Sequence, residues 1–515
     1  MLGVPAIIYC ARANINLQNH ILSERYFTSQ KQNKRMIKIY SPMKMMQKFL
    51  GRYYWQVTFI VCVALIIVMN GCNSLRYFKK QTQTQSQAQV QTIATRPFVD
   101  WCVNKTNLSE AATQTIEFML RNVGTNDCVK ANKMLSSRTE FSIEGDGITE
   151  IGPLSSLNNL TKLSLSANKI SDISPLGSLT NLTILHLDRN KISDITPLKF
   201  LTNLTELSIW YNQVSDIYPL KNLTNISVLD LSLNPIKDIN KLEKLRNLKT
   251  LVLVENQVSN INVLKDLTKL THLSLGKNQI SDISPLKHLN QLTHLGLSRN
   301  QISDISPLKH LSKLTELFLN NNKVSDITPL QSLTNLNELW LNRNRVSDIS
   351  HLKLLTNLNT LYLMNNQIYD ISPLRYLTSL TLVDMTNNKI FDLSMLDSIN
   401  LTSLYLMNNQ IEDVSSLKFM KTLKVLSLAD NKISDISPLK SLTKLTELYL
   451  SENQISDVSP LKSLTKLTRL DIANNRIADI SKLKPLTNLL ELYLEGNPLT
   501  NRNCPLVPDF RCRYE

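Results

Sequence analysis

The chain has 515 residues, of which 42% are hydrophobic and only 11 are glycine, and its formal net charge is +15. This composition excludes a collagen-like or an intrinsically disordered chain. Residues 1–71 carry a net charge of +8, which leaves +7 for residues 72–515. In residues 72–515 the basic side chains stand among aspartates rather than in one patch, so no nucleic-acid partner is predicted.

The first segment has the features of an export signal. Residues 57–69 form an uncharged apolar run that follows Lys44, Lys48 and Arg52. A membrane-spanning helix needs about 20 apolar residues, so this shorter run suits the core of a signal peptide. Residues 69–72, with the sequence MNGC, resemble the lipobox of bacterial lipoproteins, although only Gly71-Cys72 fits strictly. Cys72 is the expected lipidation site; the alternatives are an uncleaved anchor and a chance apolar stretch.

The segments around Cys72 are divided by composition. Residues 1–42 are expected to be an over-extended start, which leaves residues 43–71 as a signal peptide of ordinary length. Residues 72–97 contain the polar run QTQTQSQAQVQT and are interpreted as a flexible tether.

The sequence pattern of residues 98–139 predicts a small helical cap at the N-terminal end of an array of repeats, which occupies residues 140–499. Ser109 suits the N-cap of a helix that ends at Gly124. The apolar face expected of this helix consists of Ala112, Ile116, Met119, Leu120 and Val123. Residues 500–515 are expected to close the other end.

Four cysteines flank the array and none lies within it. We expect two disulfides that each close a local loop, because exported proteins retain such bonds. The expected pairs are Cys102 with Cys128 and Cys504 with Cys512. Four buried free thiols, or a zinc site joining the two ends, are the alternatives, and the separation of the ends disfavours zinc.

Residues 140–499 repeat one pattern, as in residues 160–176, LTKLSLSANKISDISPL. An asparagine recurs every 22 residues from Asn168 to Asn388, and again from Asn409 to Asn497 after a one-residue deletion. Leucines at the spacing L-x-x-L-x-L predict a short strand with inward leucines. The asparagine amide is expected to bond to the backbone of neighbouring coils. Ser or Thr before proline predicts an N-cap followed by a short 3₁₀ turn.

This pattern resembles the 22-residue class of leucine-rich repeats found in bacterial internalins. The resemblance implies an α/β solenoid: a horseshoe with a parallel sheet on its concave face, 3₁₀ turns on its convex side and a helical N-terminal cap. It also implies protein recognition by the concave face.

Outward strand positions on that face are where a partner site could be encoded. Four residues before the asparagine, small side chains dominate the first half of the array and aromatic ones cluster in the second. We expect these aromatics to contact a partner, with Trp340 pointing away from the core so that its removal spares folding; ladder stacking of the rings is the alternative. The predicted partner-binding residues are Phe318, Trp340, Arg343, Tyr362, Met364, Asp384, Tyr405 and Met407.

Other side-chain patterns predict no chemistry. The aspartate that recurs before the second isoleucine could bind calcium, but a turn role explains it in every coil. His272 and His294 could share a metal but have no third ligand in register. Glu316 and Glu338 resemble a glycosidase pair but would need a pocket. No catalytic residue, metal or cofactor is predicted.

The resulting interpretation is an exported, membrane-tethered and monomeric scaffold of the cell envelope or cell surface. It would be held by an N-terminal lipid or anchor and would bind a protein, or an extended polymer, on its concave face. One alternative is a cytoplasmic regulatory or scaffold subunit of a signalling enzyme, which the leader and terminal cysteines disfavour. Another is an enzyme that uses the repeats for targeting, which would need a separate catalytic domain.

Overall fold

The computed structural model describes residues 96–501, 503–505 and 512–514. The predicted signal peptide, Cys72 and nearly all of the tether lie outside the described residues. The chain divides into two compact units, residues 1–83 and 84–515, and the second contains all the features below. Within the described ranges, no helix is both long and apolar enough to cross a membrane.

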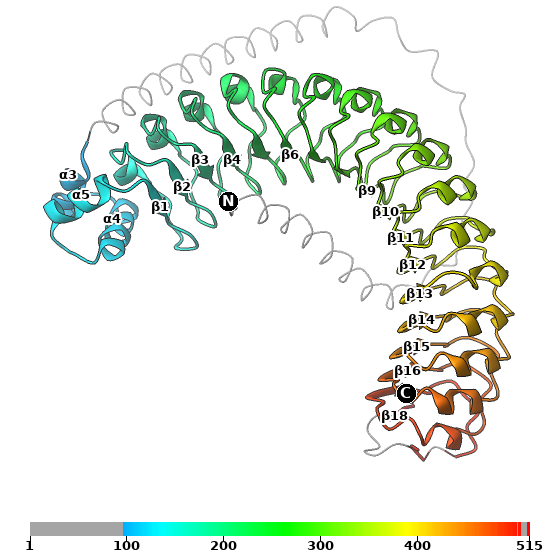
Figure 1. Cartoon of the computed structure of the whole chain (residues 1–515). Helices are drawn as coiled ribbons and strands as arrows, with labels where there is room; N and C mark the ends of the chain where they lie inside the picture. The colour runs from blue at the N-terminus through cyan, green and yellow to red at the C-terminus, as the bar shows by residue number, and fades with distance from the viewer. Residues whose placement is uncertain (1–95, 502, 506–511, 515) are drawn as a thin grey trace, which may run out of the picture. The chain divides into compact units, whose positions relative to one another are not determined.

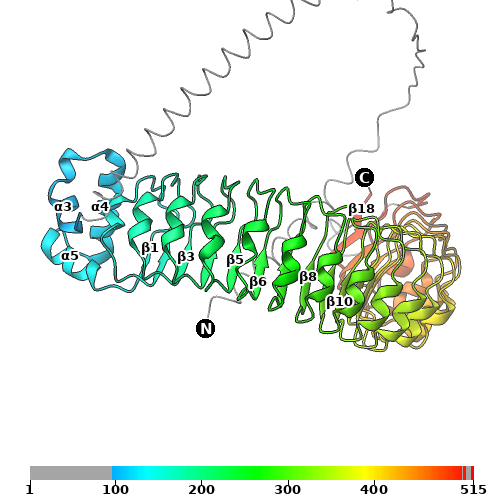
Figure 2. The ribbon, with the colours of Figure 1, turned by 90° about the horizontal axis from the view of Figure 1, so that it is seen from above.

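Three α-helices precede the repeats, as the cap prediction requires, and Figure 2 shows them together at the β1 end of the sheet. The Ser109 hydroxyl accepts a hydrogen bond from the Ala112 N–H at 3.0 Å, and Gly124 ends the same helix with a φ of 66°. The predicted N-cap, C-cap and apolar face of this helix are therefore confirmed. The helices are α3 (Phe98–Val103), α4 (Glu110–Val123) and α5 (Cys128–Ser136), with a 3₁₀ turn η2 (Lys105–Asn107) after α3.

The described residues then form one 18-stranded sheet in which each strand pairs in parallel with the next one in the chain. The pairs are in register at the repeat period, as for Leu317 opposite Leu339. The strands are β1 (Glu140–Ser142), β2 (Lys162–Ser164), β3 (Ile184–His186), β4 (Glu206–Ser208), β5 (Val228–Asp230), β6 (Thr250–Val252), β7 (His272–Ser274), β8 (His294–Gly296), β9 (Glu316–Phe318), β10 (Glu338–Trp340), β11 (Thr360–Tyr362), β12 (Leu382–Asp384), β13 (Ser403–Tyr405), β14 (Val425–Ser427), β15 (Glu447–Tyr449), β16 (Arg469–Asp471), β17 (Glu491–Tyr493) and β18 (Cys512–Arg513).

Short 3₁₀ helices return the chain along the outer side of the curve, and Figure 1 shows them opposite the strands within this unit. The predicted parallel solenoid is confirmed. The helices are η3 (Gly152–Leu154), η4 (Ser174–Ser178), η5 (Thr196–Phe200), η6 (Tyr218–Asn222), η7 (Asn240–Leu242), η8 (Asn262–Asp266), η9 (Ser284–His288), η10 (Ser306–His310), η11 (Thr328–Ser332), η12 (Ser350–Leu354), η13 (Ser372–Tyr376), η14 (Ser394–Leu396), η15 (Ser415–Phe419), η16 (Ser437–Ser441), η17 (Ser459–Ser463) and η18 (Ser481–Leu483).

The prediction that Ser or Thr caps these helices is wrong. Ser174 is already the first residue of η4, and Ile173 occupies the N-cap position without a side-chain bond. The acceptor is the recurring aspartate: Asp172 Oδ1 receives the Ser174 N–H at 2.8 Å, and Asp282 receives the Ser284 N–H in the same way. This geometry confirms the turn role of the aspartate column.

A buried asparagine ladder closes each strand. In the coil of β8, Asn300 Nδ2 donates to Leu275 O at 2.9 Å and to Leu297 O at 3.0 Å. Its Oδ1 accepts from the Ile280 N–H at 3.0 Å. One amide thus joins its own coil to the coil before it, as predicted. The residue before each ladder asparagine, from Ala167 to Asn474, is left-handed, with φ between 52° and 58°.

A second asparagine ladder, which we had not anticipated, runs on the side where the strands begin. Asn203 Nδ2 donates to Thr180 O in the coil before it at 2.9 Å, and Asn225 donates to Thr202 O at 3.0 Å. These side chains are exposed, unlike those of the first ladder. This second ladder is also discontinuous, because lysine replaces the asparagine in four coils, at Lys269, Lys313, Lys444 and Lys466.

The one-residue deletion before Asn409 falls on the convex side. The ladder continues through it, since Ile390 N–H donates to Asn409 Oδ1 at 3.0 Å. The 3₁₀ helix of this coil, η14, has three residues, as η7 and η18 also have in coils of full length. The deletion therefore leaves the strand register intact, and Val383 still lies opposite Leu404.

Both ends of the array are covalently closed. Cys102 of α3 is bonded to Cys128 at the start of α5, with a Cα–Cα distance of 5.6 Å. Cys504 is bonded to Cys512 of the last strand, with a Cα–Cα distance of 5.9 Å. Each bond closes a local loop, which limits fraying of the terminal coil.

Replacing Asn300 with alanine should destabilise the protein far more than replacing Asn203. The first change leaves the Ile280 N–H buried without a partner, at about 1–3 kcal/mol. It also removes a bond to the Leu275 carbonyl, which keeps a bond from Asn278 Nδ2. The second removes a bond that water can replace, at about 1 kcal/mol or less. Urea unfolding of both variants measures the difference, and equal losses would contradict the structural role of the buried ladder.

Candidate functional site

Three side chains of each coil point to the concave face. They are the first strand residue, the third strand residue and the residue two places before the ladder asparagine, and we call these positions rows 1, 2 and 3. In the coil of β10 they are Glu338, Trp340 and Asn342, while Leu339 and Leu341 between them are fully buried. The leucine spacing alone decides which residues face outward.

The predicted aromatic cluster is a continuous stack along row 2. The ring of Trp340 lies 5.5 Å from that of Phe318 and 4.4 Å from that of Tyr362, measured between centroids. Trp340 Nε1 donates to Glu338 Oε1 at 2.6 Å. Distances of this size are typical of favourable edge-to-face and tilted ring contacts.

Trp340 nevertheless differs from its prediction. It points to the concave face as expected, but only 6% of its surface is exposed because the neighbouring rings cover it. Its removal would leave a hole in the stack rather than a neutral surface, so Trp340→Ala is expected to reduce stability. The alternative of ladder stacking therefore accounts for the position of this ring. Phe318 and Tyr362 remain half-buried.

The remaining predicted residues of row 2 continue the line. Asp384 pairs in register with Tyr362 on one side and with Tyr405 on the other. Its Oδ1 accepts the Thr386 N–H at 3.0 Å. Tyr362, Asp384 and Tyr405 therefore form one row across three neighbouring coils.

The other predicted residues lie beside this row. Met364 and Met407 belong to row 3, and Met407 is the more accessible, with 39% of its surface exposed. Arg343 occupies the left-handed position after row 3, with a φ of 56°. All eight predicted residues thus belong to one continuous region of the concave surface and its edge.

The concave face is charged differently from the rest of the chain. Rows 1 to 3 contain no Lys or Arg over the thirteen coils from Ile184 to Ser451, although the whole chain has a charge of +15. Seven carboxylates stand in the same rows: Asp188, Glu206, Asp230, Glu316, Glu338, Asp384 and Glu447. The expectation of evenly mixed charge is therefore wrong for this face. A separate count of the charged residues in each row would have shown this excess of carboxylates in the sequence.

Burial and these carboxylates both affect the tyrosines of row 2. Burial raises the pKa of Tyr362 to about 12, and the negative charges of Asp384 and Glu338 contribute in the same direction. The pKa of Tyr405 is also raised, by burial and by Glu447 and Asp384. The phenols therefore stay neutral in a region of negative potential.

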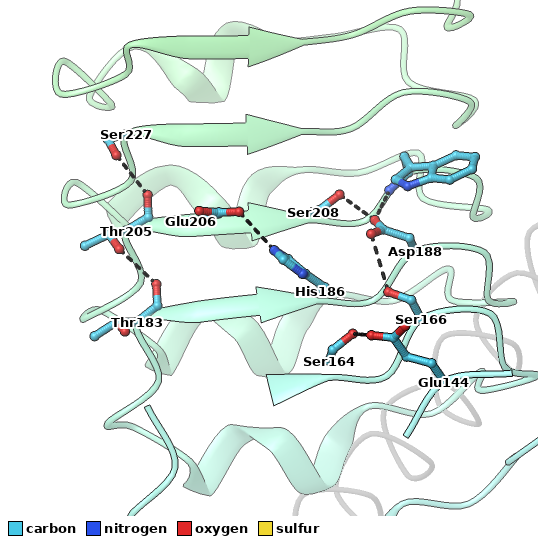
Figure 3. A network of polar contacts seen from close by, with 11 residues as sticks. Glu144, Ser164, Ser166, Thr183, His186, Asp188, Thr205, Glu206, Ser208 and Ser227 are labelled. Carbon is cyan, nitrogen blue, oxygen red and sulfur yellow. Dashed lines mark hydrogen bonds and ion pairs between the residues drawn. The ribbon is translucent and has the colours of Figure 1, made fainter. Parts of the chain in front are cut away.

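A polar network that sequence reasoning missed occupies the first coils, and Figure 3 shows it. Asp188 accepts hydrogen bonds from the Ser208 hydroxyl and from the Trp210 N–H, and burial raises its pKa. His186 Nε2 lies 3.0 Å from Glu206 Oε1, and this contact raises the pKa of His186. The Ser208 hydroxyl is bound to a carboxylate and not to the imidazole, so these residues do not form a Ser–His nucleophile pair.

The two histidines singled out in the sequence are stacked on row 1. The rings of His272 and His294 lie 4.2 Å apart, and His294 Nε2 is 3.1 Å from Glu316 Oε1. Burial, followed by the charge of His294, lowers the pKa of His272. Within the described ranges, no group of three or more His, Cys, Asp or Glu side chains is arranged to hold a metal ion.

A cavity of about 450 Å³ lies away from these residues, at the ladder edge of the sheet. Tyr211, Leu233 and Pro235 provide its apolar lining, and Gln213 and Glu255 are among its polar residues. Glu316 and Glu338 do not line this cavity, so it does not provide the pocket that a glycosidase-like pair would need.

Sequence comparisons identify the repeats. The family described as Leucine Rich repeats (2 copies) matches nine segments, and the family described as Leucine rich repeat matches residues 443–499. The nine segments are 158–200, 202–244, 246–288, 268–310, 290–332, 312–354, 356–398, 399–441 and 421–463. Together they span more than half of the chain. The chain belongs to the leucine-rich-repeat family. No curated protein sequence matches it.

Solved structures of two bacterial proteins are similar to this leucine-rich-repeat protein. An internalin (inlF) of Listeria monocytogenes is 33% identical, with 66% of this chain and 87% of that one covered and a TM-score of 0.47. A leucine-rich-repeat protein of Leptospira interrogans is 25% identical, with 75% and 98% covered and a TM-score of 0.60. The sequence identity to the internalin over most of its length confirms the internalin-type resemblance.

The same fold occurs in plants. A plant peptide hormone receptor, RGFR1, solved in complex with RGF2, is 23% identical, with 69% of this chain and 62% of that one covered and a TM-score of 0.58. At this identity the likeness concerns the fold alone. A leucine-rich-repeat fold of this kind is a scaffold typical of protein binding.

The stability gained by replacing Asp230 with asparagine should depend on pH. Burial raises the pKa of Asp230 to about 6, above its ordinary value of 3.8. Folding therefore takes up a proton between these values, and the cost of the buried charge is fully present above pH about 6 and absent below pH about 4. Asparagine keeps an oxygen that can accept the Ser232 N–H, which Asp230 Oδ1 now accepts at 2.9 Å.

Asp230→Asn should thus raise the free energy of unfolding at pH 7.5 by up to about 3 kcal/mol, at about 1.4 kcal/mol per pKa unit. The gain should shrink toward zero at pH 4. Chemical denaturation of both proteins across this range measures the difference. A gain that does not change with pH would show that Asp230 is not a buried charge.

Proposed function

We propose that this protein is an exported, membrane-tethered leucine-rich-repeat scaffold that binds a protein partner on its concave face. The contact region is the surface from Phe318 to Tyr405, with Met364, Met407 and Arg343 at its side. The scaffold itself contributes binding and no reaction. Cys72 carries the lipid that holds the protein to a membrane of the cell envelope, and residues 72–97 act as the tether.

The observation that carries the proposal is the line of aromatic side chains in row 2, with two methionines beside it in row 3. The leucines and ladder asparagines build the fold without them, so the fold leaves the identity of these residues open. Phe318, Tyr362 and Tyr405 remain partly accessible, and Met407 is exposed. Partly accessible aromatic and methionine side chains at the centre of a face are the composition of interaction hot spots.

Two further observations favour export over the cytoplasmic alternative. Cys102–Cys128 and Cys504–Cys512 are both disulfide-bonded, and such bonds persist in oxidising compartments. The leader resembles that of bacterial lipoproteins. The plant receptor with the same fold was solved with a peptide ligand, which agrees with protein recognition by this architecture.

Changing Cys72 to alanine should prevent lipid attachment. Mass analysis of the membrane-extracted wild-type protein should give an N-terminus at Cys72 with acyl chains, whereas Cys72→Ala should be released or remain unprocessed. A mature N-terminus upstream of residue 57 would instead favour an uncleaved anchor.

A photo-crosslinking residue at position 407 should capture the partner, whereas one at position 419 should not. Met407 is 39% exposed on the concave face, and Phe419 is 56% exposed on the convex side, so each tolerates substitution. Met407→Arg should then weaken binding of the captured protein by roughly tenfold, as loss of a contact worth about 1.4 kcal/mol does. Phe419→Arg serves as the matched control. Equal capture from both positions would contradict a concave site.

A further inference from the structure

Row 2 contains the order tyrosine, aspartate, tyrosine on three successive coils twice. The first triplet is Tyr362, Asp384 and Tyr405, and the second is Tyr449, Asp471 and Tyr493. In both, the strands pair in register, so the aspartate lies between the two tyrosines. Each aspartate accepts the N–H of the residue two places later, Thr386 in the first and Ala473 in the second.

The second triplet already holds guanidinium groups from the chain itself. Arg469, the row 1 neighbour of Asp471, donates to the Tyr449 hydroxyl at 3.2 Å and to Glu491 Oε2 at 2.6 Å. Its Nη1 also lies 3.8 Å from Glu447 Oε2. Arg513 of β18 places its guanidinium 5.3 Å from the centre of the Tyr493 ring. Arginine side chains therefore fit against tyrosines arranged in this way.

The first triplet receives no such group. Leu382 stands where Arg469 stands in the second triplet, and rows 1 to 3 of the surrounding coils contain no Lys or Arg. Among the described residues, Asp384 takes part in none of the ion pairs. Its carboxylate is partly buried between two phenol rings, with Glu338 on the coil before Tyr362 as a second negative charge.

We propose that Tyr362, Asp384 and Tyr405 receive a cationic side chain, arginine or lysine, from the protein that binds the concave face. This inference rests on the proposed function and adds the chemistry of the contact. The partner is a protein that presents a basic segment, because rows 1 to 3 offer carboxylates and aromatic rings here and contain no lysine or arginine that would compete with it.

The physical chemistry of Tyr362, Asp384 and Tyr405 favours this occupant. A cation over tyrosine is attracted by the negative face of the ring, most strongly where water is excluded. Burial raises the pKa of Asp384, which means that its charge is poorly solvated in the free protein. A partner cation would replace the missing solvation and form a charge-assisted hydrogen bond. An uncharged partner residue would leave the carboxylate buried without compensation.

The test uses the full-length chain and a short peptide of alternating glycine and arginine, with citrulline in place of arginine as the neutral probe. Calorimetric titration is done at low ionic strength because salt screens exposed charges. The arginine peptide should bind, and Asp384→Asn should lower the affinity for this peptide by roughly fivefold or more. Asp230→Asn is the matched control, since Asp230 holds the Ser232 N–H in the same row but lies between Ser208 and Val252. Asp230→Asn should change the affinity for the arginine peptide by no more than about twofold.

Three results would overturn the inference. The first is an equal loss of affinity for the arginine peptide in Asp384→Asn and Asp230→Asn. The second is equal affinity of the unchanged protein for the arginine and citrulline peptides. The third is no binding of the arginine peptide. Tyr362→Ala, checked for folding by its melting curve, separates the two levels of the proposal. If Tyr362→Ala lowers the affinity for both peptides equally, the surface binds protein segments regardless of their charge. That result contradicts only the proposed recognition of a cation. If neither Tyr362→Ala nor Asp384→Asn changes any binding, the proposed concave site falls as well.

Discussion

The buried amide of the ladder asparagine is the constraint on which the rest of the structure depends. Each amide must find donors and acceptors at fixed places in its own coil and in the one before, because a buried polar group without a partner is costly. Asn300 meets this demand with bonds to Leu275, Leu297 and Ile280. The requirement holds successive coils in register, so residues 22 apart stand side by side. Rows of outward side chains exist only because this register is kept.

Those rows let the chain separate its charges by face. Lysines and arginines lie on the convex side and at the edges, whereas the concave rows contain carboxylates, aromatic rings and small residues over thirteen coils. The separation has a cost within the fold, since burial raises the pKa of Asp230 and Asp384. A carboxylate that is poorly solvated in the free protein contributes little to stability. It is better suited to a contact that brings the opposite charge with it.

The sequence predicts the scaffold well and the surface less well. The scaffold is encoded by local sequence signals, each of which is compatible with one local structure. These signals are the leucine spacing, the asparagine period and the helix-capping residues Ser109 and Gly124. The exposure of Trp340 is different, because it depends on how Phe318 and Tyr362 lie against it in other coils. Asp172, and not Ser174, caps the 3₁₀ turn, because its carboxylate accepts the N–H of Ser174, which is the first residue of the turn. The charge separation was present in the sequence but was hidden by summing over all residues.

The deletion before Asn409 shows where the repeat can change length. Its coil loses a residue on the convex side, and the ladder and strand register continue through it. Whole coils are also nearly interchangeable, since residues 279–289 and 301–311 are identical. Recombination between such copies would lengthen or shorten the concave face in steps of about 4.8 Å, one strand spacing. The distance between two recognition elements on this surface can therefore evolve by duplication of coils, while every contact within a coil is retained.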